Sequence, residues 1–477
     1  MKNTKARRLS IVLLSLILAV SGCSYFAPEY KAPEVLIPDQ WQAANNGKAV
    51  NLPYLYWWQQ FKDPQLNQAI NTALVYNREV ALARSNIEMA EAALDTVALN
   101  WIPGVTFLAG LINSNNNTTL NGLSLPQIDG TAGFIGFLPQ YTLNIFSNIT
   151  RYKQAGYRLT MTEFELKAVR LAVIAKVVSA YFIATAAHKR LRLLQRLSEN
   201  VNLLYQNNNA MVEEGFGSLV ITNQLYAELN DINGQMALAQ QDMKAAKNAL
   251  RYLLGQPPGD YILKTDFAAF NPEQMIPGNL PASVIAERPD IAAAQAQLKA
   301  ANESIAVSSS LLTPNLNLNA FFARIQLYDS DQSGDSSINS KSLYATSIIS
   351  PTVFGLINQT KTAYTHAEIS YLDLINKVLH EVENALLSQH GALKKYQHNL
   401  VAKQAIADNV KISKALYDQG LISSNTYLIS RIENTTVSLV ILESKLSVLL
   451  SDVVVYQVLG GGSAYDIDSQ KKDQQGN

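Results

Sequence analysis

The chain has 477 residues, of which 48% are hydrophobic, and its 38 basic and 38 acidic side chains balance at neutral pH. This balance excludes a protein that depends on a strongly basic face, as nucleic-acid-binding proteins do. A single cysteine excludes a framework of disulfides within the chain, and the length allows one large core or several domains.

The N-terminus has the pattern of an exported lipoprotein. Basic residues precede the apolar run LSIVLLSLILAV, which is too short for a transmembrane helix and typical of a secretory signal. Residues 20–23, VSGC, match the bacterial lipobox, in which the cysteine is acylated and becomes the mature N-terminus. We expect residues 1–22 to be a signal peptide and Cys23 a lipid anchor, and Ser24 favours transport to the outer membrane of a Gram-negative bacterium. The alternative is an ordinary signal with an incidental cysteine.

Two pairs of segments repeat along the chain in the same order. The aligned pairs are residues 77–103 with 288–314, and residues 215–255 with 420–460. Neither alignment needs a gap, and both join residues that favour the same elements. We infer a tandem duplication, with repeat 1 over residues 57–255 and repeat 2 over residues 286–460.

Repeat 1 is predicted to run from a helix through two strands into a long helical hairpin. A sequence rich in Ala, Leu and Glu predicts the first helix, which Pro103 ends. Apolar alternation predicts strands at about 103–113 and 131–143, on either side of a polar loop. A helix over about 147–210 follows, and a second helix returns after the turn EEGFGS.

Repeat 2 is predicted to follow the same plan. Its strands are expected at about 314–328 and 341–353, and its long helix at about 359–418, before the turn DQGLISS and a returning helix. The remaining segments are expected to be an anchor segment, a linker between the repeats and a disordered tail, at residues 23–56, 256–285 and 461–477.

The long helices are expected to have packing partners along their length. Each carries apolar residues at alternating steps of three and four, which is the spacing of a seam between packed helices. These residues are Leu194, Leu197, Val201 and Leu204 in repeat 1, and Ile375, Val378, Val382 and Ala385 in repeat 2. Helical hairpins that bury such seams side by side could close into a tube.

The four strands set a condition on assembly. Beyond residue 22 no apolar run has the length of a transmembrane helix, so a membrane crossing would have to use strands. The smallest transmembrane barrels have eight strands, and an open edge in lipid leaves costly unpaired backbone groups. Either three chains supply a 12-stranded barrel with external loops at 113–130 and 329–341, or the strands form a small periplasmic sheet.

Each hairpin turns at a Gly-x-x-Ser sequence. Gly215 and Gly420 can adopt the left-handed conformation that ends a helix. Ser218 and Ser423 can cap the next helix by accepting hydrogen bonds from its free N–H groups. The sequence therefore predicts two tight helix-turn-helix tips.

These segments resemble the TolC-type outer-membrane efflux proteins, in their lipidated branch. The resemblance lies in the opening WWQQFKDPQLNQAINTALVYNREVALA, the segment ERPDIAAAQAQLKAANESIAVSSSLLTPNLNL and the two turns, and it covers about residues 28–460. The family motif comprises Arg288, Pro289, Asp290 and Pro314, with Pro103 at the matching position of repeat 1.

The resemblance implies a mostly α-helical fold with transmembrane β-structure. Each protomer of a homotrimer would contribute four strands to a 12-stranded outer-membrane barrel and long helices to a periplasmic tunnel. Such a protein is the exit duct of a tripartite efflux system and conducts small toxic compounds or drugs passively. Its partners would be a periplasmic adaptor and an inner-membrane transporter, which the lipidated branch suggests is proton-driven, and it would need no cofactor.

By the same resemblance, the tips would contact the adaptor and close the tunnel. The adaptor-contact residues would be Gly215, Phe216, Gly217, Ser218, Gly420, Leu421, Ile422 and Ser423. The family often places aspartates just after its second turn, but this chain has Thr426 and Ile429 there. The remaining gate candidates are Leu416, Tyr417, Asp418, Glu213 and Glu214, for which a solvated helix end is the alternative.

The residues do not predict an enzyme. The sequence HEVEN at His380 lacks the second histidine of a zinc-protease helix, and the glycines at 460–462 lack the lysine of a phosphate loop. We therefore expect no catalytic residue, metal or cofactor. Two other classes remain open: a type I protein-secretion duct of the same architecture, and a periplasmic coiled-coil adaptor or structural lipoprotein.

Overall fold

The computed structural model describes most of the two repeats. The described residues are 29–35, 37–38, 41, 56–114, 119–120, 123–124, 130–272, 285, 288–327 and 335–460. Cys23, the expected signal peptide and the expected tail lie outside these residues, as does most of the expected anchor segment.

The chain divides into two compact units, each of which contains parts of both repeats. The first unit comprises Met1–Glu34, Ile87–Thr162 and Ala294–Tyr371, and the second comprises Val35–Asn86, Glu163–Ala293 and Leu372–Asn477. The duplication and the compact units are therefore different divisions of the chain, because each repeat supplies strands to one unit and a helical hairpin to the other.

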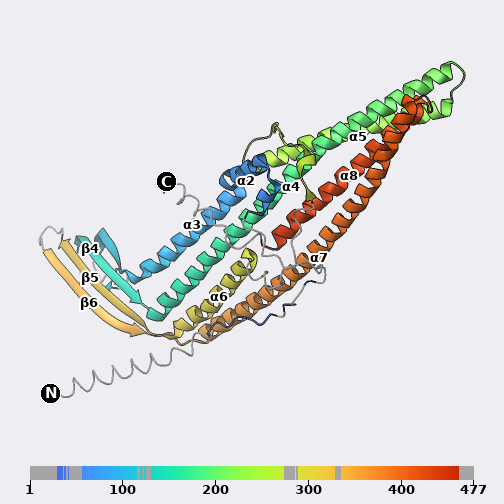
Figure 1. The fold of residues 1–477 in the computed structure, drawn as a ribbon. Helices are drawn as coiled ribbons and strands as arrows, with labels where there is room; N and C mark the ends of the chain where they lie inside the picture. Colours follow the sequence, from blue (N-terminus) through green and yellow to red (C-terminus); the bar gives the residue numbers. More distant parts are fainter. Residues whose placement is uncertain are drawn as a thin grey trace, which may run out of the picture. The chain divides into compact units, whose positions relative to one another are not determined.

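A four-stranded antiparallel sheet forms the strand part of the first unit (Figure 1). Its order is β1-β4-β5-β6, so each repeat supplies one hairpin and the hairpins meet between β4 and β5. The strands are β1 (Gly104–Ser114), β4 (Gly130–Leu143), β5 (Asn315–Leu327) and β6 (Asp335–Thr346), with a short pair β2 (Thr119–Leu120) and β3 (Leu123–Ser124).

The last strand differs from its expected position of about 341–353. β6 begins at Asp335 and ends at Thr346, and a helix begins at Pro351. Proline cannot donate to a strand ladder but suits the first position of a helix, where Ser350 accepts hydrogen bonds from the N–H groups of Thr352 and Val353. The polar residues before 341 form a strand because β5 pairs with them, from Gln326 opposite Asp335 onward. Of the loop expected at 329–341, residues 335–341 belong to β6, and the preceding residues lie outside those that the structure describes.

The two faces of the sheet differ in exposure. Phe107 is 81% exposed and lies opposite Phe137, which in turn stacks on Phe322 with ring centroids 4.9 Å apart. On the other face Leu138 and Phe321 are buried at 3% and 2% exposure. The apolar side chains of one face are thus buried within the chain, whereas those of the other face are exposed.

Seven helices of at least thirteen residues accompany the sheet in the described part of the chain. They are α2 (Pro64–Tyr76), α3 (Arg78–Ala98), α4 (Ile145–Glu213), α5 (Leu219–Leu253), α6 (Pro289–Ser309), α7 (Pro351–Asp418) and α8 (Ser424–Val458). Of these, α2, α5 and α8 lie wholly in the second unit. Short 3₁₀ turns lie at Trp57–Phe61, Leu99–Trp101, Phe267–Ala269 and Ser310–Leu312.

The core of the second unit is built on the seams predicted from the sequence. The seam residues of both long helices are buried, from Leu194, Val201 and Val382 at 0% exposure to Leu197 at 7%. In the first hairpin they form one cluster with residues of α5 and with Leu428 of α8. The three helices α4, α5 and α8 are therefore held together by a continuous apolar core.

One helix differs from the expectation that no segment beyond residue 22 could span a membrane as a helix. Among the described residues α4 alone contains a stretch long and apolar enough to cross a membrane, although 61% of that stretch is buried within the protein. Val177 and Tyr181 of this helix have 0% exposure. The expectation that no such stretch exists beyond residue 22 was too strict, because the apolar core of a long packed helix has the same composition.

The described part of the linker folds onto the second unit. Asp266 accepts a hydrogen bond from Arg192 at 2.7 Å and lies 3.4 Å from Lys189, both on α4. Lys445 of α8 donates to the carbonyl oxygens of Phe267 and Ala268 at 3.1 and 3.0 Å. The linker therefore joins the long helix of repeat 1 to the last helix of repeat 2.

Candidate functional site

The two hairpin tips end their first helices in the same way. Gly215 and Gly420 have φ values of 78° and 73°, which only glycine adopts without strain. The N–H of Phe216 donates to the carbonyl of Met211 at 2.8 Å, and that of Leu421 donates to Leu416 at 2.9 Å. With the hydrogen bonds from Gly215 and Gly420 to Val212 and Tyr417, these contacts make a Schellman motif at each tip.

The start of the returning helix differs between the tips. Ser423 accepts a hydrogen bond from the N–H of Thr426 at 3.2 Å, as expected. Ser218 makes no such bond, so its predicted capping role was wrong. The backbone angles of the two serines also differ, with φ −110° and ψ 120° at Ser218 and φ −73° and ψ 158° at Ser423.

A second glycine explains the tighter first tip. A Cβ built on Gly217 would contact the backbone nitrogen and side chain of Val212, so the chain passes too close to α4 for any side chain. The equivalent position of the second tip is Ile422, which is half-buried. The two tips are thus alike at the helix end and different in the turn.

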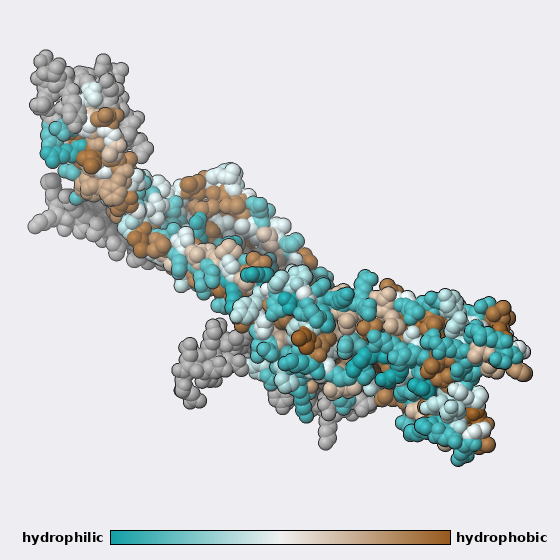
Figure 2. Space-filling view, turned by 90° about the horizontal axis from the view of Figure 1, so that it is seen from above, coloured by the Kyte–Doolittle hydropathy of each residue, from teal (hydrophilic) through white to brown (hydrophobic). Residues whose placement is uncertain are grey.

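Both tips carry exposed apolar side chains. Phe216 is 83% exposed and Leu421 66%, and Leu219 and Val220 continue the apolar surface into α5. Figure 2 shows these ends of the hairpins, at its right, with hydrophobic patches among hydrophilic neighbours. Isolated exposed apolar residues are common on protein surfaces, but here several of them occur together at the turns.

The tips are tied to each other. Asn207 of α4 donates to the side-chain oxygen of Asn425 at 2.9 Å, and the Asn425 amide lies 3.8 Å from the sulfur of Met211. The second unit therefore presents both tips as neighbouring parts of one surface. Asn207 and Asn425 were not among the expected site residues, and the sequence carries no signal that pairs them.

The gate candidates make local contacts in this structure. Asp418 pairs with Lys414, one turn earlier on α7, at 2.7 Å, and both side chains are more than half exposed. This contact raises the pKa of Lys414. Glu213 accepts a hydrogen bond from Asn209 at 2.9 Å, while Glu214 is exposed and Leu416 half-buried.

Tyr417 is the gate candidate that contacts another helix. Its ring stacks on Tyr427 of α8 with centroids 5.5 Å apart and an interplanar angle of 11°. The guanidinium of Arg431 lies over the Tyr427 ring, 5.8 Å from its centre. The stacked rings hold the end of α7 against α8, and the cation–π contact with Arg431, one turn along α8, orients the Tyr427 ring. Tyr427 and Arg431 were not among the expected site residues, because the contact of Tyr427 with Tyr417 depends on how α7 and α8 pack.

The family motif lies at the base of the hairpins, where a side chain in each repeat donates a hydrogen bond to a carbonyl at the end of the returning helix. Arg288 donates to Asp290 at 2.6 and 3.0 Å and to the carbonyl of Val458 at the end of α8. At the matching position of repeat 1, Asn77 donates to the carbonyl of Leu253 at 2.9 Å. Each residue thus joins the start of one helix to the end of the hairpin.

Glycines make room for this junction. Gly255 and Gly460 have φ values of 70° and 84°, and a Cβ on either would press against residue 76 or Arg288. Pro103 and Pro314 stand at the other end of the same segments, each directly before a strand and after a 3₁₀ turn. The motif therefore positions elements and does not present reactive groups.

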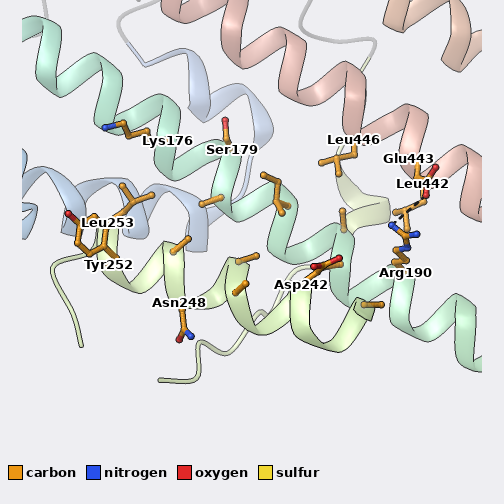
Figure 3. A pocket seen from close by; sticks show the side chains of 18 residues that line it. Lys176, Ser179, Arg190, Asp242, Asn248, Tyr252, Leu253, Leu442, Glu443 and Leu446 are labelled. Atoms are coloured by element: carbon orange, nitrogen blue, oxygen red, sulfur yellow. Dashed lines mark ion pairs between the residues drawn. The ribbon is translucent and has the colours of Figure 1, made fainter. Parts of the chain in front are cut away.

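An open groove of about 910 Å³ lies between α4, α5 and α8 (Figure 3). Alanines form much of its lining, and Ile183, Tyr252 and Leu446 add larger apolar surface. Arg190 and Glu443 form an ion pair 3.6 Å apart at one side of it. No group of acidic, histidine or cysteine side chains among the described residues could hold a metal ion.

Comparison with known proteins identifies the family. Residues 69–256 and 280–461 match the profile of the outer membrane efflux proteins. The solvent efflux pump outer membrane protein SrpC of Pseudomonas putida is 27% identical over 473 residues, which cover 94% of this chain and 97% of SrpC. The cation efflux system protein CusC of Escherichia coli is 26% identical over 313 residues, or 63% of this chain and 65% of CusC.

Solved structures show the same fold. The CmeC outer membrane channel of Campylobacter jejuni matches with a TM-score of 0.78 at 21% identity, over 94% of this chain and 98% of CmeC. The open state of the MtrE channel of Neisseria gonorrhoeae matches with a TM-score of 0.76 at 20% identity, over 92% and 99%. The family profile spans most of the chain, so this protein belongs to the outer membrane efflux protein family and is an outer-membrane exit duct of an efflux system.

Proposed function

We propose that three copies of the chain close a 12-stranded barrel through the outer membrane and that their helical hairpins line a periplasmic tunnel. The observation that carries the proposal is a sheet with two free edges and one uncovered apolar face. β1 pairs only with β4 and β6 only with β5 among the described strands. In lipid each unpaired backbone group costs several kcal/mol, so β6 of one copy must pair with β1 of the next.

The cargo we propose is a small toxic organic compound or drug, which the duct conducts passively. Support comes from the relatives, because the one named as a solvent pump protein aligns with 94% of this chain and the one named for cations with 63%. The proposed partners are a periplasmic adaptor and a proton-driven inner-membrane transporter, by analogy with the family.

The two tips are the proposed contact with the adaptor. Phe216, Gly217 and Leu421 contribute an apolar surface whose turns are fixed by the left-handed glycines. Tyr417 and Asp418, at the end of α7, are the proposed gate, since the stack of Tyr417 on Tyr427 must change if α7 moves away from α8 and Asp418 directly follows Tyr417. Cys23 is the proposed lipid anchor, which would hold the mature N-terminus at the periplasmic leaflet.

The native mass of the full-length protein, extracted from outer membranes in mild detergent, tests the proposal. We expect the mass of three lipidated chains. The variant Phe216→Ser should keep this mass, because the tip takes no part in barrel closure. A monomer would leave the strand edges unpaired and contradict the barrel, and it would favour a periplasmic coiled-coil protein.

A further inference from the structure

Asp452 is a carboxylate in an apolar interface between two helices. It lies on α8 with 0% exposure. One turn before it, Val448 packs against Leu393 and Tyr396 of α7, and one turn after it, the Tyr456 ring stacks on Trp57 with centroids 4.8 Å apart. A charge at this position would have almost no access to water.

The hydrogen bonds of Asp452 do not compensate an ionised carboxylate. Its Oδ1 accepts one bond, from the side-chain amide of Gln389 on α7 at 3.2 Å. Its Oδ2 is buried and has no hydrogen-bond partner among the described residues. A carboxylate has about four acceptor sites, so a single neutral donor leaves most of its charge unsatisfied.

No ion pair joins Asp452 to a basic side chain among the described residues, and His390, which follows Gln389 on α7, is half-buried. On α7 the facing group is the Gln389 amide, and on α8 it is the Tyr456 phenol, whose other side Trp57 covers. Lys445, two turns earlier on α8, donates to linker carbonyls, and Lys394 and Lys395 of α7 are exposed. Burial accordingly raises the pKa of Asp452 to about 8, although the Gln389 bond lowers it.

The duplication shows that this carboxylate is not required by the fold. The matching position of repeat 1 is Lys247, whose ammonium pairs with Asp260 at 2.7 Å. The same place in the hairpin therefore holds an ion pair in one repeat and an unpaired acid in the other. Only the second hairpin therefore has, at this position, a buried carboxyl group with no ion-pair partner in the part of the chain that the structure describes.

We propose that Asp452 is a proton-binding site that couples the packing of α7 against α8 to pH. In its neutral form the side chain brings no charge into the apolar interface, and its Oδ1 still accepts the hydrogen bond from Gln389. When the proton leaves, the buried charge favours local opening of the interface, which gives water access to the carboxylate. The proposal concerns the stability of the second hairpin and holds whether or not the chain is a duct.

The direction of the effect follows from proton linkage. The packed state holds the proton up to about pH 8, whereas an opened, hydrated Asp452 releases it near pH 4. Between these values the packed state binds more protons than the open state, so packing weakens as pH rises. For one proton the equilibrium changes by at most about tenfold per pH unit.

Amide hydrogen exchange of the full-length protein in detergent tests the proposal, with exchange times matched to remove the intrinsic pH dependence. Protection of residues 385–393 and 448–456 should fall by up to about tenfold per unit from pH 6 to pH 8 in the wild-type protein. In Asp452→Asn, which is neutral at every pH, that dependence should disappear. Glu443→Gln removes an exposed carboxylate from the same helix and should behave as the wild type.

Two results would overturn the proposal. One is the same pH profile for the wild type and Asp452→Asn. The other is loss of protection at every pH both in Asp452→Asn and in Asp452→Leu, because this would show that an ionised carboxylate stabilises the interface. The leucine variant fills the site with an apolar side chain, so it keeps the test valid if asparagine disturbs the packing.

Discussion

At the scale of single residues, polar side chains at helix ends hold the hairpins in place. Arg288 is 7% exposed and connects the first turn of α6 to the last carbonyls of α8, while Glu381 of α7 lies 3.6 Å away. Asn77 makes the corresponding connection in repeat 1 and also caps α3 by accepting from Glu79 and Val80. A free carbonyl at a buried helix end is costly, so one side chain stabilises two elements at once.

Replacing Arg288 with alanine should destabilise the protein by about 2–4 kcal/mol, because Asp290 and the Val458 carbonyl would lose their charged donor in a buried place. Chemical denaturation of the purified protein measures the change. Lys411→Ala removes an exposed pair on α7, 2.9 Å from Asp408, and should alter stability by less than about 0.5 kcal/mol. Equal effects of the two substitutions would show that the Arg288 junction adds no stability.

The sequence predicts the helix start at Arg288-Pro289-Asp290, but it does not predict which residue Arg288 contacts. The order Arg288-Pro289-Asp290 predicts a helix start, because proline suits the first turn and an acidic residue favours the helix N-terminus. The contact between Arg288 and Val458 joins residues far apart in the chain and follows only from packing. The same holds for Tyr417 with Tyr427, where the sequence indicated one partner and the fold supplied the other.

At the scale of elements, charged and aromatic residues of the linker between the repeats fix it against the long helix α4. Asp266 caps the turn that begins at Phe267 and pairs with Arg192 on α4. Phe267 and Phe270 are each 2% exposed, and Phe270 contacts Phe182 with ring centroids 5.0 Å apart. The turn is thus held by both an apolar core and an ionic contact.

The pairing of Asp266 predicts a dependence on acid pH. Burial opposes ionisation, but the Ala268 N–H, Arg192 and Lys189 together lower the pKa of Asp266 to about 2. Because the folded pKa is below its ordinary value, this stabilisation is present above about pH 4 and is lost as pH falls towards 2. Asp266→Asn should remove about 1 kcal/mol at neutral pH, after allowance for solvent screening, and reduce the loss in acid.

The pH dependence of the unfolding midpoint measures this effect. Asp231→Asn serves as the control, since that carboxylate is exposed and its one hydrogen bond, at 2.8 Å, comes from Gln235 on its own helix. An unchanged acid profile in Asp266→Asn would mean that the aromatic contacts alone hold the linker.

Elements also show where local patterns lead to errors. The apolar residues near 348 predicted that the last strand extends to about 353, but proline at 351 starts a helix instead. Ser218 and Ser423 occupy matching positions, yet only Ser423 caps its helix, and the backbone angles at the two serines differ. The residue type determines whether a side chain can cap or start a helix, and the backbone conformation determines whether it does.

At the scale of the whole molecule, the proposed duct requires the end of α7 to move relative to its neighbours. Such a movement would break the stack of Tyr417 on Tyr427 of α8, whereas the ion pair of Asp418 with Lys414 lies within α7 and stabilises its last turn. An exposed ion pair contributes less than about 1 kcal/mol, so its loss can shift an opening equilibrium without unfolding the tip.

Asp418→Ala should raise the open probability of the channel about threefold in a planar lipid bilayer and lower its selectivity for cations. Asp408→Ala is the matched control, because Asp408 is exposed on the same helix and pairs with Lys411 at 2.9 Å. If both variants conduct like the wild type, Asp418 is a solvated helix end and has no part in the gate.

The sequence by itself determined the duplication, the order of helices and strands, the seams of the long helices and the glycine-based tips. These features depend on periodicity and on the conformational freedom of single residues, which act locally. Only the tertiary structure decided that the two hairpin ends are neighbours, that Arg288 and Asn77 join helix ends, and that Asp452 is an unpaired acid in an apolar interface. Such contacts link distant segments, and their energies depend on burial, which no local pattern specifies.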